Sequence, residues 1–432
     1  MTNSSASASA LGSVLTRRAR HIGSRVARAV GILRQDGPRG LAQRLARIAY
    51  NRLGAASLEE LLLDGDVADS TELSLTFPDR RPSPTEPLTI GWVMSPPSAG
   101  SGGHTTLLRM VRALEEAGHR CVLFLYDRHG GDIRAHERVI REWWPDLDAE
   151  VRDATRGIDG VDACVASSWN TAHVLARRGS PMRRLYFIQD YEPYFYARGA
   201  MYVLAEDSYR FGFRCIALGE MVAELLRSEV GVVPDVVEFG CDTTVYRQLP
   251  GRERTGVVFF ARPDVPRRGY WLARLALHRF HELHPEVPIH FYGSTVRGLP
   301  FPATQHGRLS PVQLNELYNS CIAGLALSFT NISLVPEEML AAGTIPVMND
   351  SAHSRVVLQN EHAVWAGATP DALAAALSET VVRAGVVERA HAASESVRGV
   401  GWAGAQAQIV RIIEDEVYAT QTSVRESSVR SD

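Results

Sequence analysis

A group of polar side chains precedes a predicted helix in residues 325–350, LALSFTNISLVPEEMLAAGTIPVMND. These side chains are those of Ser328, Thr330, Asn331 and Ser333. Pro336 fits the first turn of the helix, and Glu338 follows it. Free N–H groups and the positive end of a helix dipole bind phosphate, and a carboxylate accepts hydrogen bonds from ribose hydroxyls. The pattern therefore indicates a nucleotide-sugar site, and an ordinary capped helix of an α/β domain is the alternative.

Three arginines follow a second predicted strand. The strand is GVVFFA, residues 256–261, and the loop after it reads ARPDVPRRG. Arg262, Arg267 and Arg268 can each donate two hydrogen bonds to a phosphate through the guanidinium group. The loop thus indicates a diphosphate site, and a solvated basic loop is the alternative.

A glycine-rich loop lies between the strand near residues 88–94 and the next helix. Gly102 and Gly103 can let the backbone approach a phosphate closely, although the pattern GSGGH differs from GxGxxG. His104 begins the helix, where the dipole lowers the pKa of an imidazole and keeps it a neutral hydrogen-bond partner. A flexible loop is the alternative.

The loop IQDYEPYFYARG, residues 188–199, is rich in aromatic side chains. Rings such as Tyr191 stack on sugar faces, and phenol groups bind sugar hydroxyls. Asp190 and Glu192 place two carboxylates in the same loop. The loop thus suggests sugar contacts, and a packed aromatic core is the alternative.

Composition excludes several classes of function. All 46 basic residues are arginine, so pyridoxal-phosphate enzymes, Schiff-base aldolases and Walker A proteins, which need lysine, are excluded. The 49 acidic residues nearly balance them, which argues against a nucleic-acid partner. Five scattered cysteines suggest neither zinc nor disulfides and fit a reducing cytosol. We also expect no transmembrane helix, no metal and no cofactor.

The elements that must position these residues alternate between strand and helix from Leu88 onward. This alternation predicts an α/β fold with two Rossmann-like domains that face a cleft, residues 88–250 and 251–402. A last helix, residues 403–418, is expected to join the first domain, and residues 419–432 to form a flexible tail.

Residues 1–87 are predicted to hold a disordered tail, a basic helical segment and a proline-rich linker at residues 77–87. Residues 11–53 contain ten arginines and one acid, with apolar residues at helical spacing. Such a helix can lie on an anionic membrane surface. Packing on the first domain is the alternative.

Several motifs together resemble the retaining GT-B glycosyltransferases. They are GSGGH, FGCDTTVYR, the ARP and RRG ends of the arginine loop, and SFTNISLVPEEMLAAGTIPV. The loop QDYEPYFY is similar to that of the WsaF-type rhamnosyltransferases, which use dTDP-rhamnose to build surface polysaccharides. The resemblance covers residues 88–418.

The resemblance implies roles for individual residues. Glu338 is expected to bind the donor ribose, and Arg262 and Arg268 the diphosphate. Thr330 stands where many related retaining enzymes carry a glutamate. The loops expected around the donor contain Gly102, Gly103, His104, Thr330, Asn331, Ser333 and Leu334. The residues expected to contact the acceptor or the donor sugar are Asp190, Tyr191 and Glu192.

The implied reaction moves a sugar, rhamnose, from dTDP to a hydroxyl of a glycan or lipid-linked glycan. It needs no cofactor beyond the donor, and it implies a cytoplasmic enzyme at the inner face of the membrane. Two other readings of the sequence remain open. They are a sugar-nucleotide epimerase of the same fold, and a non-catalytic protein that binds nucleotide sugars.

Overall fold

The computed structural model describes residues 37–418 except 41, 54, 99 and 333. The chain divides into two units, one that ends at Leu63 and one that begins at Asp64. The described part of the first unit contains helical backbone at residues 37–40 and 42–52, and the short 3-10 helix η1 (Ala55–Glu59). No described helix has the length and apolar character needed to cross a membrane.

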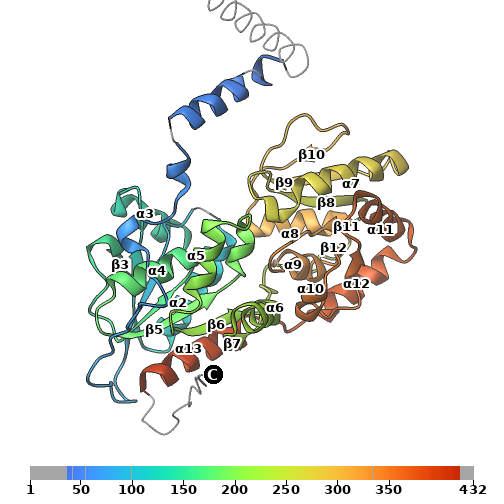
Figure 1. Ribbon diagram of the computed structural model, residues 1–432. Helices are drawn as coiled ribbons and strands as arrows, with labels where there is room; N and C mark the ends of the chain where they lie inside the picture. Colours follow the sequence, from blue (N-terminus) through green and yellow to red (C-terminus); the bar gives the residue numbers. More distant parts are fainter. Residues whose placement is uncertain (1–36, 41, 54, 99, 333, 419–432) are drawn as a thin grey trace, which may run out of the picture. The chain divides into compact units, whose positions relative to one another are not determined.

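The second unit holds two parallel sheets, each in its own domain (Figure 1). The first sheet has seven strands in the order β3-β2-β1-β4-β5-β6-β7. Its strands are β1 (Thr89–Met94), β2 (Arg120–Leu125), β3 (Glu150–Asp153), β4 (Ala163–Ala166), β5 (Arg183–Ile188), β6 (Arg214–Leu218) and β7 (Asp235–Val237). Its helices are α2 (Gly102–Glu116), α3 (Ile133–Trp143), α4 (Trp169–Arg178), α5 (Ala200–Ser208) and α6 (Glu220–Leu225).

The second sheet has six strands in the order β10-β9-β8-β11-β12-β13. The strands are β8 (Gly256–Ala261), β9 (Ile289–Gly293), β10 (Thr304–Gln305), β11 (Cys321–Leu325), β12 (Ile345–Asn349) and β13 (Val364–Ala366). The helices are α7 (Tyr270–Leu283), α8 (Pro311–Ser320), α9 (Val335–Ala341), α10 (Ala352–Val357), α11 (Pro370–Val382) and α12 (Val386–Ser396). The predicted α/β class with two Rossmann-like domains is confirmed.

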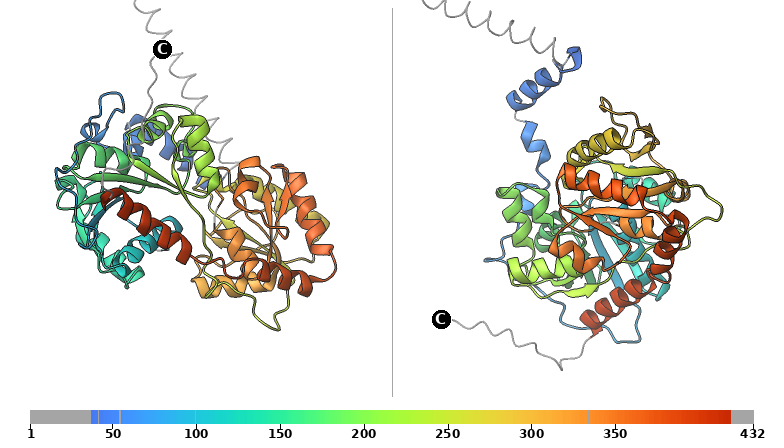
Figure 2. Two further views of the ribbon diagram at one scale, coloured as in Figure 1. Left: turned by 90° about the horizontal axis from the view of Figure 1, so that it is seen from below. Right: turned by 90° about the vertical axis from the view of Figure 1, so that its right-hand side faces the viewer.

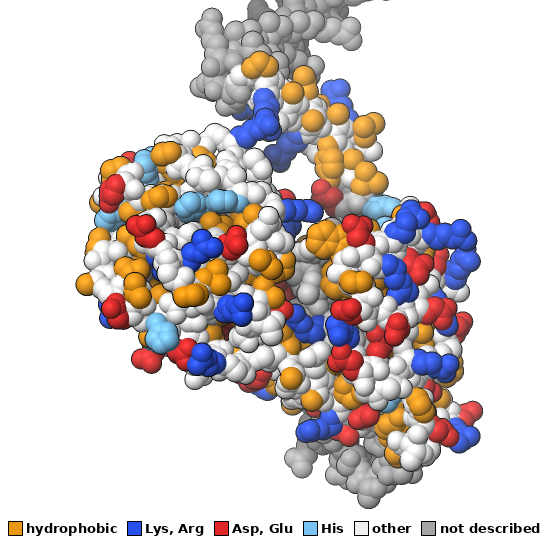
Figure 3. Space-filling view, turned by 180° about the vertical axis from the view of Figure 1, so that it is seen from behind, with side chains coloured by type: hydrophobic (Ala, Val, Ile, Leu, Met, Phe, Trp, Pro, Cys, Tyr) orange, Lys and Arg blue, Asp and Glu red, His pale blue; other side chains and the backbone are white. Residues whose placement is uncertain are grey.

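Both faces of each sheet are covered by apolar side chains, as the continuous apolar runs of the strands require. Along β8, Val257 and Phe259 enter one core cluster with α7 and α11, whereas Val258 enters the other with α8 and α9. This alternation is the two-residue period of a strand. On the outer surface, acidic and basic side chains are interspersed over the face drawn in Figure 3.

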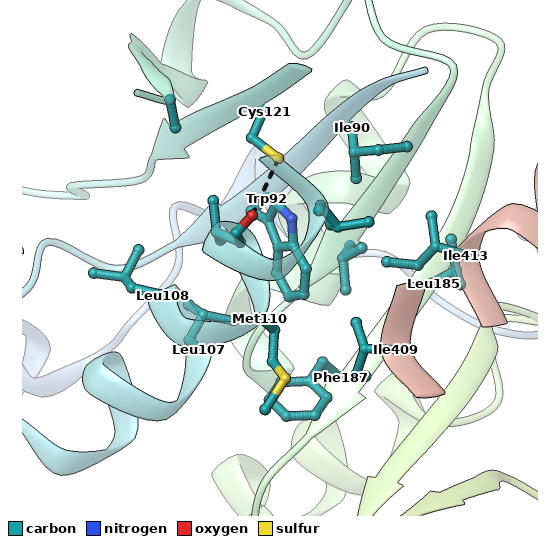
Figure 4. Packing of buried hydrophobic residues seen from close by; sticks show 14 of the residues in the cluster. Ile90, Trp92, Leu107, Leu108, Met110, Cys121, Leu185, Phe187, Ile409 and Ile413 are labelled. Atoms are coloured by element: carbon teal, nitrogen blue, oxygen red, sulfur yellow. Dashed lines mark hydrogen bonds between the residues drawn. The ribbon is translucent and has the colours of Figure 1, made fainter. Parts of the chain in front are cut away.

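The last helix, α13 (Ala403–Tyr418), packs on the first sheet although it follows the second domain in sequence (Figure 2). Its Ile409 and Ile413 lie beside Leu185 and Phe187 of β5 in the core that also holds Trp92 (Figure 4). The chain therefore crosses between the two domains twice.

The two crossings lie against each other. The backbone N–H of Cys241 in the first crossing donates to the carbonyl of Val400 in the second, at 2.9 Å. A Cβ atom on Gly240 would lie 2.8 Å from the carbonyl carbon of Gly401, so glycine is needed for this approach.

Residues that precede β1 also pack on the first domain. Asp66 is 2% exposed, and its carboxylate accepts a hydrogen bond of 2.7 Å from Tyr126 and one of 2.5 Å from Arg178. The backbone N–H of Ala68 donates to Nδ1 of His173 at 3.0 Å. The compact unit thus includes residues 64–87, which the sequence assigns to an N-terminal extension.

Candidate functional site

The candidate site lies at the carboxyl ends of the strands, where loops from both domains meet. In each sheet the strand order reverses beside the first strand of the domain, at β1/β4 and at β8/β11. Ligands of doubly wound α/β folds bind at such reversal points. The predicted site residues come from the loops that follow β1, β5, β8 and β11.

Arg268 is held by the loop that follows β8. The 3-10 turn η6 (Pro266–Arg268) ends at Gly269, whose positive φ of 65° starts α7. Nη1 of Arg268 donates to Oγ of Ser328 at 3.2 Å. Burial lowers the pKa of Arg268, and the nearby carboxylate of Asp190 raises it. Arg268 is thus a largely desolvated cation, as a diphosphate site requires.

Asn349 fixes the backbone of Ser328 in this arrangement. Oδ1 of Asn349, the last residue of β12, accepts from the N–H of Ser328 at 2.9 Å, and its Nδ2 donates to the Ser328 carbonyl at 2.8 Å. The Ser328 hydroxyl also donates to the carbonyl of Asn331. Sequence reasoning missed Asn349, which carries no motif of its own.

Arg262 lies in the same loop but faces another partner. Its guanidinium group makes two hydrogen bonds with Asp264, of 3.2 and 3.0 Å. The Arg262 side chain is 40% exposed. The structure therefore separates the two predicted diphosphate ligands, with Arg268 inside the junction and Arg262 paired at the surface.

Glu338 lies in the first turn of α9 and is partly buried. Burial, and then the like charge of Glu337, raises the pKa of Glu338 to about 8, whereas a hydrogen bond with Tyr246 lowers it. Tyr292 lies at the end of β9. Burial, and then the charge of Glu338, raises its pKa, and the charge of Arg268 lowers it. The predicted ribose ligand and one predicted diphosphate ligand thus share a buried neighbour.

The glycine loop reaches the same junction from the first domain. Gly102 and Gly103 form the exposed start of α2, and Nε2 of Gln189 donates to the Gly103 carbonyl at 3.1 Å. His104 contacts Oγ of Ser101 at 2.8 Å and the Ser95 carbonyl at 3.2 Å. The His104 pKa is lowered, as the sequence predicts, and burial is the largest cause.

Two side chains of the loop after β11 bind the first domain. Nδ2 of Asn331 donates to the carbonyls of Gln189 and Leu218, at 2.7 and 3.2 Å, where β5 and β6 end. Oγ1 of Thr330 donates to Oδ2 of Asp190 at 3.1 Å. The structure thus brings Thr330 and Asn331, which the sequence places around the donor, together with Asp190, which it expects to contact the acceptor or the donor sugar. Leu334 packs against the first domain's core, and Ser333 lies outside the described residues.

Tyr191 and Glu192 point away from this junction into the first domain. Tyr191 is fully buried and stacks on Tyr209, with ring centroids 5.7 Å apart. The Glu192 carboxylate accepts from the backbone N–H of Trp169 and, at 2.9 Å, from the Tyr186 hydroxyl. Burial raises the pKa of Glu192 to about 8. These two residues have the packed-core arrangement that the sequence leaves as the alternative.

Metal ions in proteins are commonly held by groups of histidine, cysteine, aspartate and glutamate side chains. Within the described ranges, no group of three or more His, Cys, Asp or Glu residues is placed to hold a metal ion. The charged groups at the junction are instead arginines and single carboxylates, which bind phosphates and hydroxyls.

Two parts of the chain match models of a known protein family. Residues 152–220 match the model of the WsaF N-terminal domain, and residues 255–378 match that of the WsaF C-terminal domain. The O-antigen biosynthesis protein RfbC of Myxococcus xanthus is 30% identical over 333 residues, which is 72% of this chain. The chain spans 25% of the length of that relative.

Solved structures share the fold at low sequence identity. The Anabaena protein HepE in complex with UDP-glucose has a TM-score of 0.60 at 13% identity, and covers 76% of this chain and 100% of its own. A Listeria monocytogenes protein described as a candidate UDP-N-acetylglucosamine 2-epimerase has a TM-score of 0.52 at 11% identity, with 77% and 96% covered. The chain is therefore WsaF-like and has the GT-B fold.

Proposed function

We propose that this WsaF-like chain is a glycosyltransferase that moves rhamnose from dTDP-rhamnose to a hydroxyl of a growing surface polysaccharide, with retention of configuration. The observation that carries the proposal is the arrangement of Arg268, Ser328 and Glu338 around the end of β9. A guanidinium and a hydroxyl bind a diphosphate, and a carboxylate beside them binds ribose hydroxyls.

The relatives support the same class of reaction. HepE binds UDP-glucose, which supports a nucleotide-sugar donor here. RfbC is described as an O-antigen biosynthesis protein, which supports a polysaccharide acceptor. The choice of dTDP and rhamnose is supported by the resemblance of the loop at residues 189–196 to the WsaF-type rhamnosyltransferases.

The residues of the site suit a reaction in which a diphosphate leaves. As the bond between the anomeric carbon and the phosphate oxygen breaks, negative charge accumulates on the diphosphate, and the guanidinium of Arg268 stabilises that charge. The acceptor oxygen bonds to the same face of the anomeric carbon and gives its proton to the departing phosphate oxygen. Such a reaction requires neither a dedicated protein base nor a metal ion.

The location of the reaction follows from its substrates and from the cysteines. All five cysteines are free and buried, which suits a chain that folds in a reducing cytosol. We propose a cytoplasmic enzyme that meets a glycan or lipid-linked acceptor at the inner face of the membrane. The basic segment of residues 11–53 is the proposed contact, of which residues 37–40 and 42–53 are described.

Two other functions fit less well. An epimerase would need acidic or basic groups on the sugar, and Asp190 and Glu192 are the candidate pair. Asp190 faces the second domain, but the Glu192 carboxylate is bound inside the first domain by Tyr186 and Trp169. A protein that only binds nucleotide sugars would use the same Arg268, but it would release no nucleoside diphosphate when an acceptor is added.

The proposal is tested by incubating the protein with dTDP-rhamnose or UDP-glucose, with and without a polysaccharide acceptor, in the presence of EDTA. Release of nucleoside diphosphate only when acceptor is present is the expected result. Conversion of the sugar nucleotide without acceptor would favour the epimerase. A thermal-shift panel of sugar nucleotides identifies the donor, because a ligand at a hundred times its Kd stabilises by about 2.7 kcal/mol.

A further inference from the structure

Asp190 is a buried carboxylate that spans the junction between the two sheet domains. It follows β5 of the first domain, yet its Oδ2 accepts a hydrogen bond from Thr330 of the second domain at 3.1 Å. Only 9% of the residue is exposed. Its other oxygen, Oδ1, has no hydrogen-bond partner within the described part of the chain.

A carboxylate in this position is costly unless cations compensate it. Burial of an ionised group with an unsatisfied oxygen carries a large desolvation penalty, and burial raises the pKa of Asp190. Nε of Arg267 lies 3.9 Å from Oδ2 of Asp190, and the charge of Arg268 also acts on this carboxyl group. The two arginines thus compensate the charge of Asp190, and hydrogen bonds from Thr330 and from the backbone of Asn331 hold its carboxyl group in place.

Arg268 in turn depends on Asp190 for compensation of its buried charge. Arg268 is desolvated, and Asp190 is the first carboxylate among the groups that stabilise its charge. The guanidinium of Arg267 lies 4.0 Å above the ring centroid of Phe195, which belongs to the same aromatic loop as Asp190. Asp264, the acidic residue of the arginine loop itself, pairs with Arg262 and not with these two arginines. Arg267 and Arg268 thus share one resident anion.

We propose that Asp190 is the resident counter-ion of Arg267 and Arg268, which holds these two arginines until the diphosphate of the donor displaces it. This inference rests on the proposed function, because it requires a nucleoside diphosphate as ligand. A diphosphate and a carboxylate repel each other when both approach the same guanidinium groups. Donor binding therefore releases Asp190 from the arginines, and the carboxylate becomes available for a hydroxyl of the sugar or the acceptor.

The inference predicts that removal of a negative charge improves binding. In Asp190→Asn, the amide oxygen still accepts the Thr330 hydrogen bond, but it no longer competes for the arginines. UDP and dTDP should bind to Asp190→Asn about threefold more tightly or better, as expected for the loss of one nearby like charge. Turnover should fall, because the released carboxylate is missing. If Asp190 only held the two domains together, Asp190→Asn would bind the nucleotides more weakly than wild type.

Two variants control for other effects. Thr330→Val removes the hydrogen bond but keeps the carboxylate, so it should not tighten binding. Glu224→Gln removes one negative charge and another contact between the domains, since Glu224 lies 3.2 Å from His353. Because this pair is far from the arginine loop in sequence and contacts neither arginine, Glu224→Gln should also not tighten binding.

The measurement is isothermal titration of UDP and of dTDP into full-length wild type and the three variants, after thermal melting has shown that each is folded. Tighter binding to Asp190→Asn alone is the expected result. Equal or weaker binding to Asp190→Asn, with clear binding to wild type, would overturn the counter-ion role and leave the proposed function standing. If wild type binds neither nucleotide, the proposed function fails and the inference fails with it.

Discussion

Arg109 stacks on Trp402, with the guanidinium carbon 4.7 Å from the ring centroid, although the two residues belong to opposite ends of the second unit. Nη2 of Arg109 lies 3.7 Å from Oδ2 of Asp242. Asp242 belongs to the first crossing between the domains and Trp402 to the second. Arg109 is part of α2, which begins at Gly102 in the candidate site, so one helix connects the site with both crossings.

Replacement of Arg109 by alanine should therefore destabilise the protein and loosen the two crossings. A stacked cation and a partly buried ion pair together suggest a loss of about 1–2 kcal/mol in the free energy of unfolding. Urea unfolding measures the change. Arg112→Ala is the matched control, because Arg112 lies one turn further on and makes only exposed ion pairs with Glu116 and Asp146. A similar loss in both variants would contradict a special role for Arg109.

The sheets were largely predictable because buried parallel strands are continuous apolar runs. The run LTIGWVM contains β1, and GVVFFA is β8 itself. The strand β3 carries no such run, since its sequence is EVRD and its residues are exposed or only partly buried. Edge strands of this kind have no hydrophobic pattern that a single sequence can reveal.

The sequence marks candidate side chains by their type, but it does not reveal their contacts. The hydroxyls and the carboxylate of the segment around Glu338 predict a nucleotide-sugar site from residue type alone. The hydrogen bond between Thr330 and Asp190, however, joins positions 140 residues apart. It depends on how the two domains pack, which no local pattern encodes. For the same reason the sequence could not tell that Asp190 and Glu192 point in different directions.

Glu338→Gln should weaken the binding of dTDP or its sugar derivative, and the effect should grow with pH. In the unbound protein the pKa of Glu338 is raised to about 8, so the carboxyl group is neutral below that pH and ionised above it. An ionised carboxylate accepts hydroxyl hydrogen bonds more strongly than an amide, by about 1 kcal/mol or more. Titration calorimetry at pH 6 and pH 9 measures the difference from wild type.

Glu337→Gln is the control for the same helix turn. Glu337 raises the pKa of Glu338, so its neutralisation should lower that pKa and shift the pH dependence of binding towards lower pH. Binding at pH 9 should remain close to that of wild type. Equal affinities of wild type and Glu338→Gln at every pH would remove Glu338 from the nucleotide site.

Arg268→Ala and Arg262→Ala should both weaken nucleoside diphosphate binding, with the larger loss at Arg268. A charged hydrogen bond contributes about 1.5–3 kcal/mol. Arg268 is already placed beside Ser328, whereas Arg262 must leave Asp264 before it can contribute. Titration with dTDP, and with thymidine as a ligand without phosphate, measures the effect. If both variants bind dTDP like wild type, the loop is only a basic surface.

Glu192→Gln should flatten the pH dependence of stability. The pKa of Glu192 is raised to about 8 in the folded protein, compared with about 4.3 for an unfolded glutamate. Between these values the unfolded chain releases the proton that the folded protein keeps, so this group makes the wild type less stable as pH rises from about 4.5 to 8. The glutamine variant lacks this contribution. Urea unfolding at pH 5, 6.5 and 8 should show its stability rising relative to wild type, and parallel profiles would contradict the burial of a neutral Glu192.

The basic N-terminal segment should bind anionic membranes. In its described part, Arg39, Arg47 and Arg52 are exposed, and so are the apolar side chains of Leu45, Ile48 and Leu53. Attraction to anionic lipid contributes about 1 kcal/mol per basic residue near the surface and weakens as salt screens the charge.

Co-sedimentation with anionic and with zwitterionic vesicles tests this binding. Full-length protein should sediment with the anionic vesicles at low salt and be released at high salt. A shortened chain that begins at Asp64, where the compact unit begins, should stay in solution. A start near residue 85 would be a poorer choice, because it removes the contacts of Asp66 and Ala68 with the first domain. In the full chain, replacement of the four arginines Arg39, Arg44, Arg47 and Arg52 by glutamine should reduce binding without truncation. Equal binding by the full-length and shortened chains would place the membrane contact on the sheet domains. If neither chain binds, the basic segment does not contact the membrane, and the alternative that it packs on the first domain is favoured.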